Sequence, residues 1–449
     1  MGAARVRIAA ELTWTGRAFE PGVVVEIGGD GRIAAVRREG ESGDGGDGGS
    51  ADGRDLLRLP RRALLPGLVN AHSHAFQRGL RGRGETFPAG AGSFWSWREE
   101  MYGLVGALDR RRLFDLSLAA FREMRAAGIT AVGEFHYLHH DDPGTADFAF
   151  DEVVLAAAAE APIRIVLLHA YYATGGIGRP LEGAQRRFAC ASPADYWRQL
   201  DRLAGRLSPD GTQTLAAVAH SIRAVPLDDL AALHREARRR GLPFHLHLEE
   251  QRREIEDCVA AHGRRPIELL LALDPGPETT AVHCTHSEPA DLARFAAAGG
   301  HVCVCPLTEA NLGDGIPPLA AVPAARDVLC LGSDSNARIS LVEEARWLEY
   351  GQRLAGERRG ALAGDDGEVA PVLLVAATAG GADALGLPAG EIAPGRWADL
   401  LALDLDHPSL AGAGADTLLA AFLFGAGDDA VAATALAGRW SPAVAPAPG

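Results

Sequence analysis

Short apolar runs alternate with helical stretches along most of this chain, and this alternation restricts the fold more than any other feature. Eight such runs precede loops and segments with apolar residues at three- and four-residue intervals. The runs are ALLPGLVNAH (63–72), ITAVGEFH (129–136), IRIVLLHA (163–170), LAAVAHS (215–221), PFHLHLE (243–249), TAVHCTH (280–286), HVCVCP (301–306) and VLCLGSD (328–334). Eight strand–loop–helix units predict an α/β protein, and they fit a (β/α)8 barrel better than an open sheet.

Both ends of the chain lack this alternation and have the pattern of short strands separated by Gly-rich turns. The strand-like segments are residues 5–14, 22–29 and 31–39 before the barrel, and residues 390–406 and 429–440 after it. We expect the two ends to form one small β-sandwich domain. Its parts would be residues 1–64 and 391–449, and residues 65–390 would form the barrel.

Composition restricts the classes of function. The 449 residues include 44 Lys+Arg and 59 Asp+Glu, and the net charge of −15 argues against a nucleic-acid-binding surface. No lysine occurs, which excludes a Walker A motif, a pyridoxal Schiff base and a carbamylated lysine between two metals. Six cysteines without a CxxC pair are typical of buried residues in a reducing compartment. No apolar stretch is long enough to span a bilayer, so we expect a cytoplasmic protein without membrane partners.

Residues that bind metals or transfer protons stand where the predicted barrel strands end. They are His72, His74, His247, Glu250, His283 and Asp334. Side chains at positions i and i+2 of a strand point to the same face, so the HxH pair presents two imidazoles together. Because reactive side chains of such barrels lie at the carboxyl ends of the strands, we expect this group to converge. Three imidazoles, one carboxylate and a position for water would form a catalytic site for a divalent metal.

The spacing of residues within the motifs selects between neighbouring candidates. His245 also points inward, but Leu248 stands three residues after it, whereas Glu250 stands three residues after His247. A base that acts on metal-activated water should follow its ligand directly, which favours His247 with Glu250 over Glu249.

Two further predictions concern histidines outside this pair. His286 falls in the loop after its strand, so His283 is the better candidate at that strand end. The cluster of His136, His139 and His140 has no partner pattern, and we expect it at the surface or behind the site.

A site of this kind has a defined chemistry. Without lysine there is no carbamate bridge, so the centre should hold one metal ion, which lowers the pKa of its bound water to about 7. Glu250 and Asp334 would transfer protons, and His283 would stabilise charge on the attacked atom.

Several motifs resemble a known superfamily. PGLVNAHSH, HLHLEE, TAVHCTH, GSDS and EIAPGRWADLLALD are similar to the mononuclear deaminase branch of the amidohydrolases. More specific segments between roughly residues 66 and 354 resemble the N-formimidoyl-L-glutamate deiminase family of histidine degradation. These segments are HAFQRGLRG, SFWSWREEMYGL, EFHYLHHD, AHSIRAVP, GRRPIELLL, CPLTEANLGDGIPP and SLVEEARWLEYGQRL.

The resemblance implies a site and a reaction. Zinc would be held by His72, His74, His247 and Asp334, with Glu250 and His283 catalytic. The substrate would contact Gln77, Arg98, Tyr137, His220 and Arg223. The implied enzyme is a homodimeric hydrolase of a linear amidine. It would convert the dicarboxylate N-formimidoyl-L-glutamate to N-formyl-L-glutamate and ammonia. One departure is visible, because Asn336 and Ala337 follow GSDS where the family commonly has His.

Two alternatives remain open at this point. Another mononuclear amidohydrolase, such as a guanine deaminase or a chlorohydrolase-like aminohydrolase, would share the metal site and differ in the pocket. Arg98 and Arg223 favour an acidic substrate, because guanidinium groups bind carboxylates through two parallel hydrogen bonds. A non-catalytic barrel of the dihydropyrimidinase-related type would be expected to have lost metal ligands, which are all present here.

Overall fold

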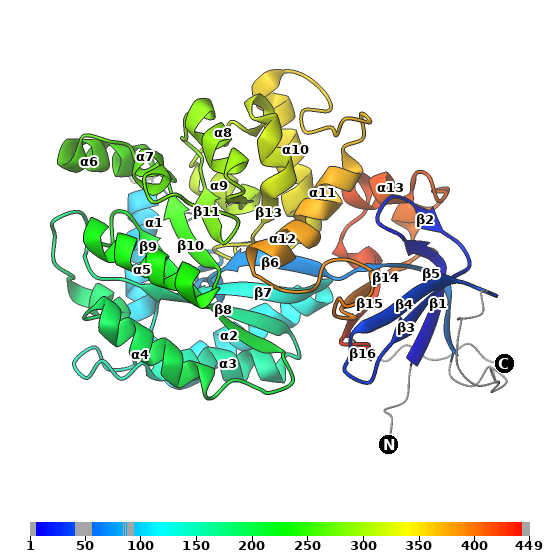
Figure 1. Cartoon of the computed structure of the whole chain (residues 1–449), viewed down its shortest axis with the longest axis horizontal. Coiled ribbons are helices and arrows are strands. Elements are labelled where there is room, and N and C mark those ends of the chain that lie inside the picture. The colour runs from blue at the N-terminus through cyan, green and yellow to red at the C-terminus, as the bar shows by residue number, and fades with distance from the viewer. Residues whose placement is uncertain (1–5, 41–55, 84, 86, 88–93, 442–449) are drawn as a thin grey trace.

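The strands form two eight-stranded sheets, one parallel and one mixed (Figure 1). The computed structural model describes residues 6–40, 56–83, 85, 87 and 94–441. The parallel sheet curls into a nearly closed barrel, and the mixed sheet lies beside it. The expected α/β barrel with a second β unit built from both chain ends is confirmed.

The barrel strands neighbour one another in chain order, and every pair is parallel. They are β6 (Leu68–Ser73), β7 (Ile129–His136), β8 (Arg164–Tyr171), β9 (Gln213–Ser221), β10 (Phe244–Leu248), β11 (Thr279–His283), β12 (His301–Val304) and β13 (Leu329–Leu331). A parallel bridge between Ser73 and Asp334 joins the two ends of this order. Asp334 N donates to His72 O at 3.0 Å, and His74 N donates to Asp334 O at 2.8 Å. The barrel therefore closes at the level where the predicted metal ligands stand.

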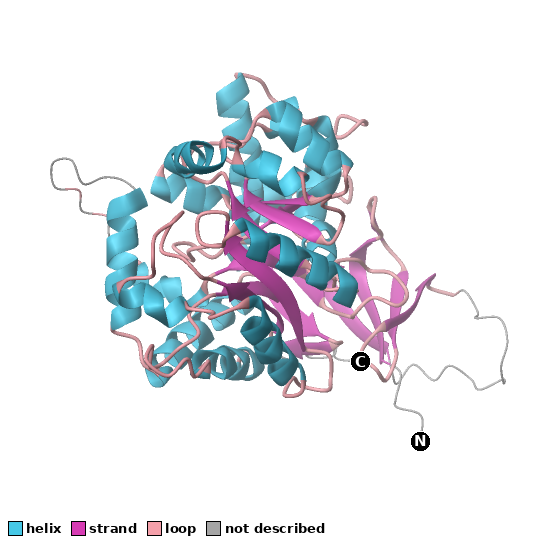
Figure 2. Cartoon of the chain, turned by 60° about the vertical axis from the view of Figure 1, so that its left-hand side comes forward, coloured by secondary structure: helices cyan, strands magenta, loops and turns pink. Residues whose placement is uncertain are grey.

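Helices cover the outside of the barrel (Figure 2). They are α1 (Phe94–Gly106), α2 (Arg110–Ala126), α3 (Ala149–Glu160), α4 (Pro193–Ala204), α5 (Leu227–Arg240), α6 (Arg252–His262), α7 (Pro266–Leu271), α8 (Pro289–Ala297), α9 (Pro306–Leu312), α10 (Leu341–Gly356), α11 (Ala370–Ala376), α12 (Ala379–Ala384) and α13 (Leu418–Gly425). Helices α1–α9 lie between successive barrel strands, α10–α12 follow the last of them, and α13 lies between β14 (Leu400–Asp404) and β15 (Val431–Leu436) of the mixed sheet. Capping side chains fix several starts: Asp109 accepts from Arg112 N before α2, and Ser340 accepts from Glu343 N before α10.

The mixed sheet combines strands from both chain ends in the order β16-β15-β14-β5-β1-β3-β4, with β2 paired to β1. Only the β1–β5 pair is parallel within this sheet of described residues. Its strands are β1 (Val6–Trp14), β2 (Phe19–Glu20), β3 (Val23–Ile27), β4 (Ile33–Arg38), β5 (Leu56–Pro66), β14 (Leu400–Asp404), β15 (Val431–Leu436) and β16 (Arg439–Ser441).

The first predicted barrel strand is in fact divided between the two sheets. Residues 63–66 belong to β5, where Leu64 pairs with Ala402 of β14, and β6 begins at Leu68. Gly67 stands at the division, where a Cβ would lie 2.2 Å from Thr130 Oγ1. Pro66 has no N–H to donate to a strand ladder, and only glycine fits so close to Thr130 at position 67. These two features explain why one apolar run is divided between two sheets.

A buried ion pair joins the two sheets. Arg164 of β8 donates from Nε and Nη2 to the two carboxylate oxygens of Asp399, at 2.7 and 3.1 Å. Its guanidinium also lies 4.1 Å from the ring centre of Trp397. This bidentate pair fixes the tail of the chain against the barrel.

Two simpler predictions about the interior can be compared directly with the structure. All six cysteines are free and buried, as expected. Within the described ranges, no helix combines the length and the apolar character needed to cross a membrane.

Candidate active site

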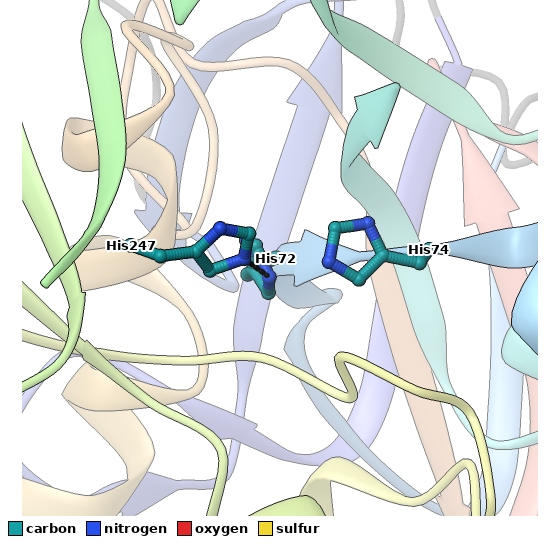
Figure 3. A group of neighbouring side chains, drawn as sticks. All are labelled: His72, His74 and His247. Atoms are coloured by element: carbon teal, nitrogen blue, oxygen red, sulfur yellow. Dashed lines mark hydrogen bonds between the residues drawn. The ribbon is translucent and has the colours of Figure 1, made fainter. Parts of the chain in front are cut away.

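Three histidines converge at the carboxyl end of the barrel (Figure 3). His72 and His74 come from the end of β6 and His247 from β10. The Nε2 atoms of His72 and His247 are 3.2 Å apart, and Asp334 Oδ1 lies 3.4 Å from His72 Nε2 and 3.3 Å from His74 Nε2. Four ligands placed tetrahedrally around zinc lie about 3.3 Å from one another. The observed spacings therefore fit one divalent ion.

The protonation of these rings also suits a metal. The Nδ1–H of His74 donates to Phe135 O at 2.8 Å, and that of His247 donates to His220 O at 3.0 Å. Since a carbonyl only accepts, each Nε2 keeps its lone pair toward the centre. Burial lowers the pKa of His74 to about 3 and also lowers the pKa values of His72 and His247. Neutral imidazoles with inward lone pairs are the form that binds metals.

The loop after β13 is shaped to present Asp334. A Cβ on Gly332 would lie 2.7 Å from His72 Cβ, so only glycine permits this approach. Asn336 is buried and donates from Nδ2 to Ser73 Oγ at 3.1 Å and to Asp334 O at 3.2 Å. The residue that departs from the related family thus holds the loop of the carboxylate ligand. Ala337 is exposed.

His283 lies beside the cluster. Its Nε2 is 3.9 Å from Asp334 Oδ2, the carboxylate oxygen that does not face His72 and His74. Its Nδ1 is 3.3 Å from Oε1 of Glu309, a buried residue that sequence reasoning missed. Burial disfavours the charged ring, but the carboxylates around it, Glu250 foremost, outweigh this and raise the pKa of His283 to about 10. A divalent cation in the centre would oppose that rise.

The two adjacent glutamates after β10 face different surroundings. Glu249 adopts a left-handed backbone conformation, is fully buried, and accepts hydrogen bonds from Ile267 N and Arg265 Nη2. Glu250 lines the pocket next to the histidines, where its Oε2 accepts a hydrogen bond from Arg223 Nη2 at 3.0 Å. The predicted base is thus the glutamate that faces the pocket.

All five predicted substrate contacts line this same pocket: Gln77, Arg98, Tyr137, His220 and Arg223. Its wall also contains six aromatic side chains, namely Phe94, Trp97, Tyr102, Tyr137, Tyr172 and Phe188. Most of these were not singled out from the sequence. Tyr172 could have been found, because it stands two residues after the predicted barrel strand 163–170.

Gln77 and Tyr137 form a polar pair in the pocket wall. Gln77 Nε2 donates to Tyr137 Oη at 2.8 Å, and the Tyr137 hydroxyl donates to Met101 Sδ at 3.9 Å, a weak acceptor that a ligand oxygen could replace. His220 lies nearby with its Nδ1 3.0 Å from Ser221 Oγ. Burial, reinforced by Arg223, lowers the pKa of His220, so this ring is neutral.

The two arginines are held differently. The Arg98 guanidinium of α1 lies 5.5 Å from the ring centre of Trp95 and 5.3 Å from that of Tyr102. Arg223 pairs with Glu250, while its buried Nε and Nη1 have no hydrogen-bond partner among the described residues. Arg223 Nη1 also lies 3.8 Å from Oε2 of the buried Glu254, whereas Arg98 forms no ion pair with a described carboxylate. Both guanidinium groups can still donate to an anion in the pocket.

We expected His136, His139 and His140 at the surface or behind the site, and the surface location is wrong, because all three are buried. Asp151 of α3 accepts from four side chains: His136 Nε2 at 3.0 Å, His139 Nδ1 at 2.9 Å, His169 Nε2 at 2.9 Å and Gln199 Nε2 at 2.6 Å. The Gln199 contact is made by its NH2 group, which can only donate, so Asp151 accepts these hydrogen bonds as a carboxylate. The cluster anchors the segment that carries Tyr137 into the pocket.

Comparison with known proteins agrees with this geometry. Residues 63–441 match the Amidohydrolase family. The chain belongs to the amidohydrolase family. Among its relatives, formimidoylglutamate deiminase of Pseudomonas aeruginosa is 41% identical over 423 residues, covering 92% of this chain and 90% of that protein. The resemblance that the motifs indicated is confirmed.

Two solved structures are similar to this amidohydrolase over almost its whole length. An amidohydrolase from Brucella melitensis has a TM-score of 0.85 at 33% identity, covering 97% of this chain and 94% of that one. An adenosine deaminase from Xanthomonas campestris, solved with bound zinc, has a TM-score of 0.78 at 25% identity, covering 97% of this chain and 92% of that one.

Proposed function

We propose that this amidohydrolase hydrolyses the formimidoyl group of N-formimidoyl-L-glutamate, giving N-formyl-L-glutamate and ammonia, as a step of histidine degradation. One observation carries the proposal: two arginines with available donors line the same pocket as the metal-binding histidines. Such donors bind carboxylates, and this substrate has two. The relative from Pseudomonas aeruginosa supports the same choice.

The metal we propose is zinc, held by His72, His74, His247 and Asp334. Nitrogen and oxygen donors with tetrahedral spacing suit zinc, and the similar adenosine deaminase was solved with it. When bound, the ion supplies an activated water at neutral pH and positive charge beside the reacting carbon.

The residues around this centre would move the protons. Glu250 accepts the proton of the attacking water and delivers it to the leaving nitrogen, so that ammonia departs. Arg223 Nη2, at 3.0 Å from Glu250 Oε2, fixes the direction of that carboxylate. His283 presents its Nε2 toward Asp334 Oδ2, where it can donate to the oxygen added at the formimidoyl carbon, and Asp334 can relay the second proton.

Substrate positioning falls to the other pocket residues. Arg98 and the free donors of Arg223 would bind the two carboxylates, assisted by the Tyr137 hydroxyl, the Gln77 amide and His220. The amidinium is already cationic, so attack needs little further polarisation, and correct placement becomes the main requirement. The family resemblance further implies a homodimer, and the composition of the sequence suggests the cytoplasm; both stay predictions.

A second candidate is deamination of a heterocycle such as guanine. Six aromatic side chains line the pocket and could stack against a flat base. A heterocycle without carboxylates would make little use of Arg98, so this arginine separates the two candidates.

Replacing Arg98 with methionine is expected to raise KM for N-formimidoyl-L-glutamate by about ten- to a hundredfold, since a hydrogen bond to a charged group contributes about 1.5–3 kcal/mol. Zinc content should stay unchanged, because Arg98 contacts Trp95 and Tyr102 rather than the metal ligands. The control is Arg122→Met on α2, which removes a surface ion pair with Glu160 of α3. Steady-state ammonia release measures both, and an unchanged KM in Arg98→Met would contradict the proposed role.

A further inference from the structure

A second cavity lies directly outside the active-site pocket. Trp95 and Arg98 of α1, the loop from Gly175 to Arg179, Arg223, and Arg253 of α6 line this outer cavity. Arg98 and Arg223 line both spaces, so one pair of guanidinium groups separates them. The lining elements follow β6, β8, β9 and β10, which places the outer cavity at the carboxyl end of the barrel.

The outer cavity is positively charged, although the protein is acidic. Four arginines line it, and Asp257 is the single acid among its described lining residues. The Asp257 carboxylate is half-exposed and 3.9 Å from Arg253 Nε, a geometry that neutralises little charge. Arg179 is exposed, and no carboxylate of the described ranges lies within ion-pair distance of it. Arg223 is paired with Glu250 and lies 3.8 Å from Glu254, so the excess positive charge of the cavity comes from Arg98 and Arg179, which form no ion pair with a described carboxylate.

The arrangement of these cations is fixed by aromatic contacts. The centre of the Trp95 ring lies 4.7 Å from the Arg253 guanidinium and 5.5 Å from that of Arg98. One indole therefore contacts both Arg253, which lines the outer cavity, and Arg98, which lines the outer cavity and the pocket. The Nε and Nη1 atoms of Arg223 are buried without a partner among the described residues. Arg98 and Arg179, without a paired carboxylate among the described residues, and the weakly paired Arg253 together form a site for an anion.

We propose that the outer cavity is a capture site for the carboxylates of the incoming substrate. A dicarboxylate of glutamate size would first pair with Arg179 and Arg253, and then transfer its carboxylates to Arg98 and Arg223 in the pocket. The proposal rests on the proposed function and adds a route of entry to it. The two carboxylates of the substrate outweigh its one cationic amidinium, so a protein of net charge −15 repels it at long range, and a local positive field at the entrance opposes that repulsion.

The test is a double variant, Arg179→Gln with Arg253→Gln, in the zinc-loaded enzyme. At low ionic strength, KM for N-formimidoyl-L-glutamate should rise by about three- to tenfold with kcat unchanged, because charges at an entrance act mainly on association. The difference should shrink in physiological salt, where exposed charges are screened beyond about 8 Å. The matched control is Arg111→Gln with Arg122→Gln on α2, which makes the same change in net charge at exposed positions.

Two outcomes are decisive. Equal KM values for the double variant and its control at low salt would overturn the proposal. Should the double variant be poorly folded, Arg179→Gln alone alters one exposed loop side chain and must still raise KM.

If the wild-type enzyme releases no ammonia from the substrate, the proposed function fails. Calorimetric titration with glutarate then tests the capture site independently of the reaction. The proposal predicts that glutarate binds more weakly to the double variant than to the control, and equal binding would refute the proposal.

Discussion

Replacing His72 with alanine is expected to abolish zinc binding and ammonia release together. His72 Nε2 lies 3.2 Å from His247 Nε2 and 3.4 Å from Asp334 Oδ1, so it contributes a central donor of the cluster. Removal of one of four ligands leaves an incomplete site, and activity that depends on an activated water is lost with the metal. Metal analysis of the purified variant and an ammonia assay measure the two effects.

His245→Ala is the control for this variant. His245 is also a fully buried barrel histidine, but its Nε2 contacts Ala384 O at 2.8 Å rather than the cluster. This variant should lose stability and keep zinc. Full zinc occupancy with normal turnover in His72→Ala would show that the metal site is assigned to the wrong residues.

Glu250→Gln is expected to retain zinc and to lower kcat by about 10²–10⁴-fold, the usual contribution of a general acid–base group. The amide keeps the shape of the side chain but cannot accept the proton of the attacking water. It can still receive the hydrogen bond from Arg223 Nη2, so the pocket should keep its form. Rapid kinetics together with metal analysis separate a loss of proton transfer from a loss of zinc.

The neighbouring glutamate provides the comparison. Glu249 is buried against Ile267 N and Arg265, away from the pocket lining, so Glu249→Gln should affect stability more than kcat. A severe loss of kcat in Glu249→Gln alongside near-normal Glu250→Gln would mean that the base has been assigned to the wrong carboxylate.

Much of the site could be predicted because a parallel barrel gathers the ends of its strands. His72, His247 and Asp334 are far apart in the chain, yet each stands at a strand end, and this position alone predicts that they meet. The HxH spacing similarly places His72 and His74 on one face of β6. Strand periodicity and barrel geometry together are sufficient for this part of the site.

Other features depend on contacts that no local pattern encodes. Asp151 gathers four side chains from separate elements, and its own position at the start of α3 is that of an ordinary helix residue. The pairing of Arg223 with Glu250 is equally non-local, and it gives a predicted substrate contact a second role in orienting the base. The division of residues 63–72 between two sheets follows from one close contact, that of Gly67 with Thr130. Apolar periodicity carries no information about such contacts.

The most direct test of the proposed function is ammonia release by the zinc-loaded wild-type enzyme from N-formimidoyl-L-glutamate and from guanine, measured side by side. Because arginines line the pocket, we expect robust turnover of N-formimidoyl-L-glutamate, with N-formyl-L-glutamate as the second product, and no turnover of guanine. Robust turnover of guanine with none of N-formimidoyl-L-glutamate would contradict the proposed substrate and leave the metal site intact.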